Sequence, residues 1–124
     1  MEPAALHPDA DHRRYLTEGR FMLQRSRSDG VFVFPPRVAR PGSGATDLEW
    51  TPASGLGTVH STTVVRCKPP AVDYNVALID LDEGPRLMSR IDGIAPAAVR
   101  IGMRVRARVT IESDAPLLVF EQLV

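Results

Sequence analysis

Cysteine, lysine and long apolar runs are scarce in this sequence, and each shortage excludes a class of protein. Cys67 is the only cysteine among the 124 residues, so the chain has neither an internal disulfide nor a cysteine-based metal cluster. Lys68 is the only lysine, and fifteen basic residues are balanced by fifteen acidic ones, which is atypical of proteins that bind phosphate backbones. No apolar run is long enough to cross a bilayer, and residues 1–11 lack the charged start and apolar core of a signal peptide. We therefore expect a cytoplasmic protein without a membrane partner.

Strand patterns dominate from residue 51 onward. Residues 104–112 alternate between apolar and polar side chains without interruption, which predicts a half-buried strand. Gly55 and Gly57 precede another apolar run and predict a bulge or a sharp bend. The expected strands are 58–67, 74–81, 86–91, 104–112 and 117–122. Five strands with a long connection between the third and the fourth are typical of the OB fold, so we predict a five-stranded OB-fold barrel over residues 51–124.

The first fifty residues are less regular. Residues 1–19 are expected to form a tail and a short N-terminal helix, with Asp9 or Asp11 as the N-cap and Gly19 as the left-handed C-cap. Residues 20–50 contain two short apolar runs separated by turn-forming residues, which predicts a small β-ribbon with two turn-like knuckles. The fold class is therefore mostly β: a short helix, a small β-ribbon and an OB-fold domain.

No group of residues has the spacing of an active site, so no catalytic residue is predicted. The three histidines do not share an element at metal-ligand spacing, and the sequence contains neither a nucleophile elbow nor a phosphate-binding loop. The most suggestive charges are Arg104, Arg106 and Arg108, which lie on one face of the strand expected at 104–112. In one interpretation they bind phosphates or an acidic partner, and in the other they form a solvated face.

Several short motifs occur in the order found in a known family. They are Glu18-Gly19-Arg20, Phe34-Pro35-Pro36-Arg37, Thr46-Asp47-Leu48-Glu49-Trp50, Ser54-Gly55-Leu56-Gly57-Thr58-Val59, Tyr74-Asn75-Val76-Ala77-Leu78-Ile79, Glu83-Gly84-Pro85-Arg86 and Ile101-Gly102-Met103-Arg104-Val105. Together they resemble the DUF-35 family, whose members combine a rubredoxin-like zinc ribbon with an OB fold and associate with thiolase-like enzymes of acyl-CoA metabolism. The resemblance runs through most of the chain and implies the same fold as the strand pattern.

The ribbon departs from the pattern of that family. Its members usually carry two Cys-x-x-Cys knuckles, whereas the corresponding positions here are Ser26, Asp29, Arg40 and Ser43. These positions lack the thiolates that hold a structural zinc ion, so the ribbon is expected to be metal-free. Structural zinc supplies about 10–16 kcal/mol of apparent binding energy in zinc-finger peptides. Apolar packing or the surface of a partner must replace part of that stabilisation.

The resemblance implies a non-catalytic accessory subunit of a thiolase-like acyl-CoA enzyme, placed near the CoA channel of the complex. The predicted partner-binding residues are Phe32, Phe34, Arg37 and Trp50. Arg37 and Arg86 are the predicted contacts to CoA phosphates, through bidentate pairing. CoA or acyl-CoA would bind within the complex, and no tightly bound cofactor is expected.

An OB-fold protein that binds nucleic acid is the alternative interpretation. Such sites stack bases on aromatic side chains within a positively charged groove. The expected second and third strands offer only Tyr74 as an aromatic residue, and the turn between them contains Asp82 and Glu83. Nucleic acid is therefore the less favoured partner, and a stand-alone enzyme is less favoured still.

Overall fold

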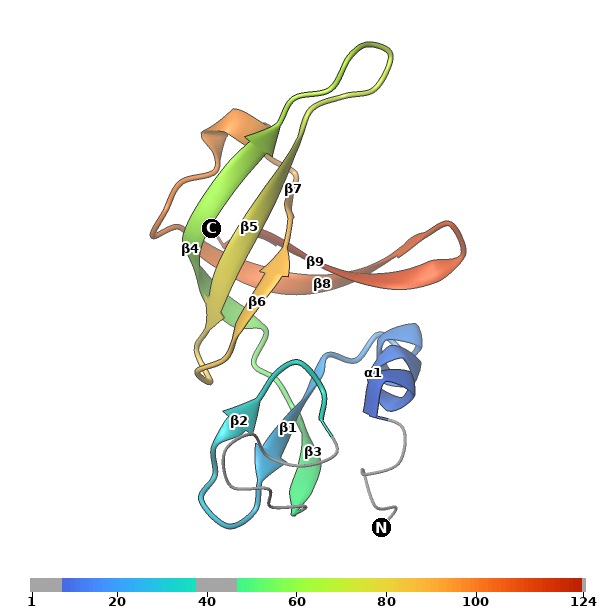
Figure 1. Ribbon diagram of the computed structural model, residues 1–124, viewed down its shortest axis with the longest axis vertical. Coiled ribbons are helices and arrows are strands. Elements are labelled where there is room, and N and C mark those ends of the chain that lie inside the picture. The colour runs from blue at the N-terminus through green and yellow to red at the C-terminus, as the bar shows by residue number, and fades with distance from the viewer. Residues whose placement is uncertain (1–7, 38–46, 124) are drawn as a thin grey trace.

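A computed structural model describes residues 8–37 and 47–123 (Figure 1). The predicted helix is α1 (Pro8–Thr17), and Gly19 ends it with a φ of 76°. The Gly19 N–H donates to the carbonyl oxygen of Leu16 at 2.9 Å, and the Arg20 N–H donates to that of Tyr15 at 2.8 Å. This is the Schellman arrangement, so the predicted helix and its glycine C-cap are confirmed. The predicted N-cap is wrong, because the helix already includes Pro8 and both Asp9 and Asp11 lie in its first turn. No helix in the two described ranges is long and apolar enough to cross a membrane.

The ribbon is a three-stranded antiparallel sheet in the order β2-β1-β3. The central strand β1 (Met22–Ser26) lies between β2 (Phe32–Val33) and β3 (Leu48–Pro52). All residues of β1 except Arg25 are buried, because α1 contacts this strand and Leu23 belongs to the same hydrophobic cluster as the OB-fold core. The ribbon is thus packed directly on the domain that follows it.

The second sheet has OB-fold topology and contains all the predicted strands. Its elements are β4 (Leu56–Val65), β5 (Tyr74–Leu81), β6 (Arg86–Ser89), β7 (Ile91–Asp92), β8 (Arg104–Glu112) and β9 (Ala115–Gln122), with a short helix η1 (Pro96–Ala98) before β8. The strand order is β6-β5-β4-β8-β9-β7. The strand predicted at 86–91 is divided at Arg90: β6 pairs antiparallel with β5, whereas β7 pairs parallel with β9.

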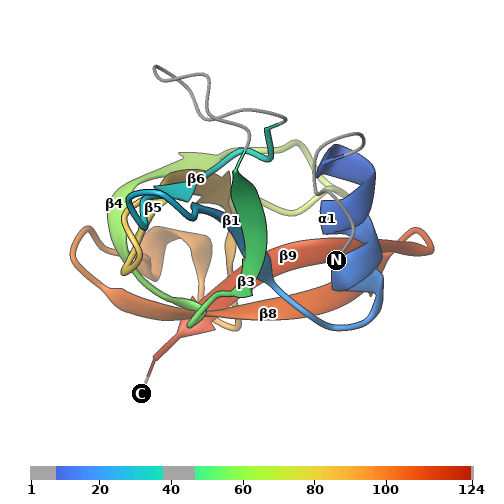
Figure 2. The same cartoon turned by 90° about the horizontal axis from the view of Figure 1, so that it is seen from below.

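This sheet curls but does not close into the predicted barrel. In Figure 1, β8 and β9 cross the direction of β4 and β5, so the sheet bends around its core. Its two edge strands are β6 and β7, and among the described residues β6 pairs with no strand other than β5. A seam therefore remains open between β6 and β9. Figure 2 shows α1 next to β9, at the side of this seam.

Two glycines shape the start of β4. Gly55 has a φ of 78° and supplies the predicted bend, while the irregularity in the β4–β5 register lies further on, between Val59 and Ser61. Gly57 allows β4 and β5 to approach closely, because a Cβ atom there would lie 2.7 Å from Cγ2 of Ile79. The core that these strands enclose includes Leu23, Val59, Ile79, Leu87, Ile91, Val105 and Phe120.

Candidate functional site

His12 lies at the centre of an aromatic cluster that joins α1 to the ribbon. Its ring centroid is 5.8 Å from that of Phe34, 6.2 Å from that of Trp50 and 6.3 Å from that of Phe21. Trp50 also packs edge-on against Tyr15 at 5.4 Å. Phe34 and Trp50 are therefore half-buried by the chain itself and can offer a partner only part of their surface. Their role in partner binding stays a prediction.

The cluster favours the neutral form of His12. Burial lowers the pKa of His12 below its ordinary value of 6.5, and the nearby charge of Asp9 offsets this only in part. Within the described residues, His12 Nε2 and Trp50 Nε1 are buried without a hydrogen-bond partner. A proton added at Nε2 would therefore lose its hydration without gaining an acceptor.

We expect the free energy of unfolding to decrease as the pH falls below about 6.5. The His12 pKa is lower in the folded state, so the unfolded state binds more protons. The stabilisation is complete above the unfolded-state pKa and is lost as the pH falls through the folded-state value. Urea denaturation at a series of pH values between about 5 and 8 measures this slope. His12→Phe should flatten it, whereas the control His60→Gln should retain it. An unchanged slope in His12→Phe would contradict the assignment.

Arg37 is held through its backbone, and its side chain extends into solvent. The buried amide of Gln24 donates from Nε2 to the Arg37 carbonyl oxygen at 2.7 Å, and its Oε1 accepts the Arg37 N–H at 2.6 Å. The Arg37 side chain is exposed and makes no ion pair with any residue in the described ranges. Phe32 is half-buried, with the Arg25 guanidinium 5.7 Å from its ring centre. Of the predicted partner-binding residues, Arg37 is thus the most accessible.

Arg86, the other predicted CoA contact, is already paired within the sheet. Its Nε donates to Asp80 Oδ1 at 2.6 Å, directly across the β5–β6 ladder. This hydrogen bond is the main reason why the pKa of Asp80 lies below its ordinary value. A CoA phosphate would have to compete with Asp80 for Arg86, whereas Arg37 has no such competitor among the described residues. The CoA contacts of both arginines stay predictions.

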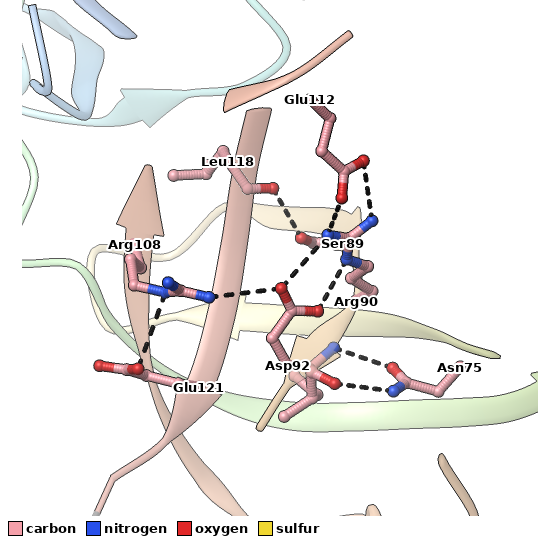
Figure 3. Close-up of polar contacts among 9 residues, drawn as sticks. Asn75, Ser89, Arg90, Asp92, Arg108, Glu112, Leu118 and Glu121 are labelled. Atoms are coloured by element: carbon pink, nitrogen blue, oxygen red, sulfur yellow. Dashed lines mark hydrogen bonds and ion pairs between the residues drawn. The ribbon is translucent and has the colours of Figure 1, made fainter. Parts of the chain in front are cut away.

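The arginine stripe of β8 is neutralised by neighbouring carboxylates. Arg104 pairs with Asp82 at 2.7 Å, Arg106 with Glu121 at 2.8 Å, and Arg108 with Asp92 at 3.4 Å and with Glu121 at 3.8 Å. Arg90 extends the network by bonding both Asp92 and Glu112, as Figure 3 shows. The hydrogen bond from Arg90 also lowers the pKa of Glu112. These contacts favour the solvated ion-pair face over a phosphate-binding groove.

The ribbon positions that correspond to zinc ligands do not form a zinc site in the part of the chain that the structure describes. Two of the four, Arg40 and Ser43, lie outside the described residues. Ser26 is buried, and its hydroxyl lies 3.0 Å from the Ser28 hydroxyl and 3.4 Å from Asp47 Oδ1. Asp29 Oδ1 accepts a backbone N–H of the same turn at 3.1 Å. A neutral hydroxyl and one carboxylate do not match the thiolates of a structural zinc site, and the absence of zinc stays a prediction.

The seam between β6 and β9 contains an apolar groove that the sequence patterns did not reveal. Its volume is about 330 Å³, and its apolar lining comes from Leu16, Phe34, Leu87, Met88, Leu117 and Leu118. Asp9, His12 and Arg13 of α1 line its other side. Met88 is 69% exposed and Leu117 is 37% exposed, although both are large apolar residues. Met88 is the residue that could have indicated this groove, because it is a large apolar residue at an outward position of β6, next to the buried Leu87.

Comparisons with known proteins identify relatives of this chain. The family model described as the C-terminal OB-fold domain of ChsH2 matches residues 50–110. A probable enoyl-CoA hydratase alpha subunit of Thermomonospora curvata is 38% identical over 89 residues, which are 69% of this chain and 28% of that protein. A DUF35 domain-containing scaffold protein of Pyrococcus furiosus is 29% identical over 96 residues, which are 74% of this chain and 71% of that protein.

A solved structure extends the similarity over the whole chain. The structure described as Ltp2-ChsH2(DUF35) aldolase contains a chain that superposes with a TM-score of 0.85 at 31% identity, covering 99% of this chain and 100% of that chain. The present chain spans only about a quarter of the length of the hydratase subunit. The similarity to that subunit is therefore to one part of a larger protein.

Proposed function

Because this chain belongs to the DUF35 family, we propose that it is a non-catalytic, cytoplasmic accessory subunit of a thiolase-like acyl-CoA enzyme. The observation that carries this proposal is the match over 99% of the chain to the DUF35 chain of an aldolase structure. Relatives from Pyrococcus furiosus and Methanocaldococcus jannaschii are named scaffold proteins, which supports a role in assembly. Two other relatives are named as alpha subunits of hydratases that act on CoA thioesters, which supports acyl-CoA as the substrate class.

The side chains support an accessory role over catalysis or nucleic-acid binding. In residues 8–37 and 47–123, no three His, Cys, Asp or Glu side chains come together in a group that could hold a metal ion. The β8 arginines are paired with carboxylates, so they do not form the positively charged groove that a nucleic acid requires. None of the relatives named above is described as a nucleic-acid-binding protein.

We propose that Arg37 contacts the partner enzyme or a CoA phosphate, because its guanidinium is exposed and has no ion-pair partner among the described residues. Gln24 orders the Arg37 backbone in the folded chain, so less conformational freedom is lost when the guanidinium binds. A guanidinium pairs in bidentate fashion with either a carboxylate or a phosphate. Phe32, Phe34 and Trp50 would add apolar surface around it.

Co-expression with the thiolase-like enzymes of the same genome should give a stable complex in size-exclusion chromatography. Arg37→Glu is expected to weaken this complex about tenfold or more, because it turns an attractive contact into a repulsive one. Arg100→Glu is the matched control: Arg100 is also exposed and unpaired among the described residues, but it follows η1 on another part of the chain. The proposal fails if the chain binds none of these enzymes, or if the chain alone turns over an acyl-CoA.

A further inference from the structure

The groove between β6 and β9 exists because the strand that follows β5 changes its partner. Up to Ser89 this strand pairs with β5, and after Arg90 it pairs with β9. Two contacts connect the strands at this change of partner. The Ser89 hydroxyl donates to the Leu118 carbonyl oxygen at 3.0 Å (Figure 3), and the Phe120 N–H donates to the Arg90 carbonyl oxygen at 3.0 Å. Before this point β6 and β9 diverge, and apolar side chains of both strands line the space between them.

The groove is only partly filled by the residues that the structure describes. Leu16 of α1 and Leu87 of β6 are buried at 7% and 4% exposure. Met88 and Leu117, which come from the two diverging strands, stay largely or partly in solvent. A flexible methionine beside a leucine at the mouth of an apolar groove is a typical protein-binding surface, because it can adapt to an incoming side chain.

The backbone of β9 argues against the addition of a partner strand at this edge. The Leu118 carbonyl and the Phe120 N–H both point toward the Ser89–Arg90 side. Since alternate residues of an antiparallel strand present their backbone groups to the same side, Pro116 presents its backbone to the groove as well. Proline has no N–H to donate, so it interrupts any ladder there. The groove is therefore suited to side chains and not to a pairing strand.

The rim of the groove carries an unpaired cation. Arg13 on α1 lines the groove and is exposed, and its guanidinium makes no ion pair or hydrogen bond with any residue in the described ranges. Most of the described arginines, by contrast, pair with a carboxylate or lie over an aromatic ring. Asp9 also lines the groove, but its charge acts on His12, and it makes no ion pair with Arg13 within the described ranges. A groove with apolar walls and this guanidinium at its rim complements an apolar side chain that has a carboxylate close to it.

We infer that this groove receives an apolar side chain of the thiolase-like partner enzyme, with a partner carboxylate against Arg13. The inference rests on the function proposed above and assigns one part of that interface to Met88, Leu117 and Arg13. Burial of Met88 and Leu117 by the partner would also close the seam that the sheet leaves open.

The test uses the complex obtained by co-expression, and binding is measured with separately purified chain and enzyme. Met88→Glu is expected to weaken binding about 10- to 100-fold, because it places a carboxylate in an apolar groove that the partner desolvates. Ile101→Glu is the matched control, since Ile101 is 72% exposed and Met88 is 69% exposed, and Ile101 lies on the loop between η1 and β8. Arg13→Glu should weaken binding about tenfold, with less effect at high salt. Thermal unfolding of each variant alone verifies that the fold is retained.

The possible outcomes separate this inference from the proposed function. If no thiolase-like enzyme binds the wild-type chain, the proposed function fails. If the wild type binds and Met88→Glu binds as well as Ile101→Glu, the groove inference fails and the proposed function stands. If the chain alone forms a dimer that Met88→Glu dissociates, the groove holds a second copy of the chain, and the inference is overturned.

Discussion

Gly57→Ala is expected to destabilise the fold by about 3 kcal/mol, which corresponds to roughly 10 °C in Tm for a domain of this size. A Cβ atom at this position would lie 2.7 Å from Ile79 Cγ2 and 2.9 Å from the Asp80 carbonyl oxygen. Neither neighbour can move freely, because Ile79 is fully buried and Asp80 is paired with Thr58 in the β4–β5 ladder. The strands must separate, and the core next to them must repack.

Gly93→Ala is the control for this substitution. Gly93 has a φ of 78° but has open space where a Cβ atom would lie. Its replacement should cost only the backbone strain of a left-handed residue, about 1–2 kcal/mol. Urea and thermal denaturation of both variants give the comparison. A Gly57→Ala variant that melts within a few degrees of the wild type would show that β4 and β5 have room for a methyl group.

Asn75→Leu is expected to cost about 3 kcal/mol or more, because it leaves two buried backbone groups without partners. Asn75 is 4% exposed, and its Nδ2 donates to the Ile91 carbonyl oxygen at 2.9 Å. Its Oδ1 accepts the Ile91 N–H at 2.9 Å (Figure 3). The side-chain amide thus replaces a pair of backbone hydrogen bonds at the point where β7 no longer pairs with β5. Each backbone group of Ile91 left unpaired would cost about 1–3 kcal/mol.

Asn75→Asp separates the two hydrogen bonds. The carboxylate keeps the acceptor for the Ile91 N–H but places an oxygen against the Ile91 carbonyl oxygen, so the variant should be less stable at neutral pH than in mild acid. Thr63→Leu, at an exposed position of β4, is the control for a change from a polar residue to leucine. Chemical denaturation measures all three variants. Equal stability of Asn75→Leu and Thr63→Leu would contradict a structural role for the amide.

The strands whose first and last residues could be predicted are those whose ends carry a signal in the adjacent sequence. The bounds expected at 74–81 and 104–112 agree with β5 and β8, because β8 alternates without interruption and β5 is a mostly apolar run bordered by Asp73 and Asp82. The strand expected at 58–67 begins two residues earlier, at Leu56, because Gly57 is accepted into the ladder where β4 meets β5 and β8. The division of the next strand at Arg90 had no local signal, since it depends on pairing with β9.

Residue type and periodicity by themselves determined most of the strands along the chain, the glycine-capped helix and the face on which the β8 arginines lie, because these properties depend on neighbours within a few positions. Only the tertiary structure decided which partners these groups have. The arginines are neutralised by carboxylates more than ten residues away in the sequence, and Asn75 hydrogen-bonds the backbone of Ile91, 16 residues away. The aromatic residues Phe34 and Trp50 enclose a histidine from α1. The groove beside Met88 likewise exists because β6 and β9 diverge in space, and the local pattern carries no information about the distance between two strands that do not pair.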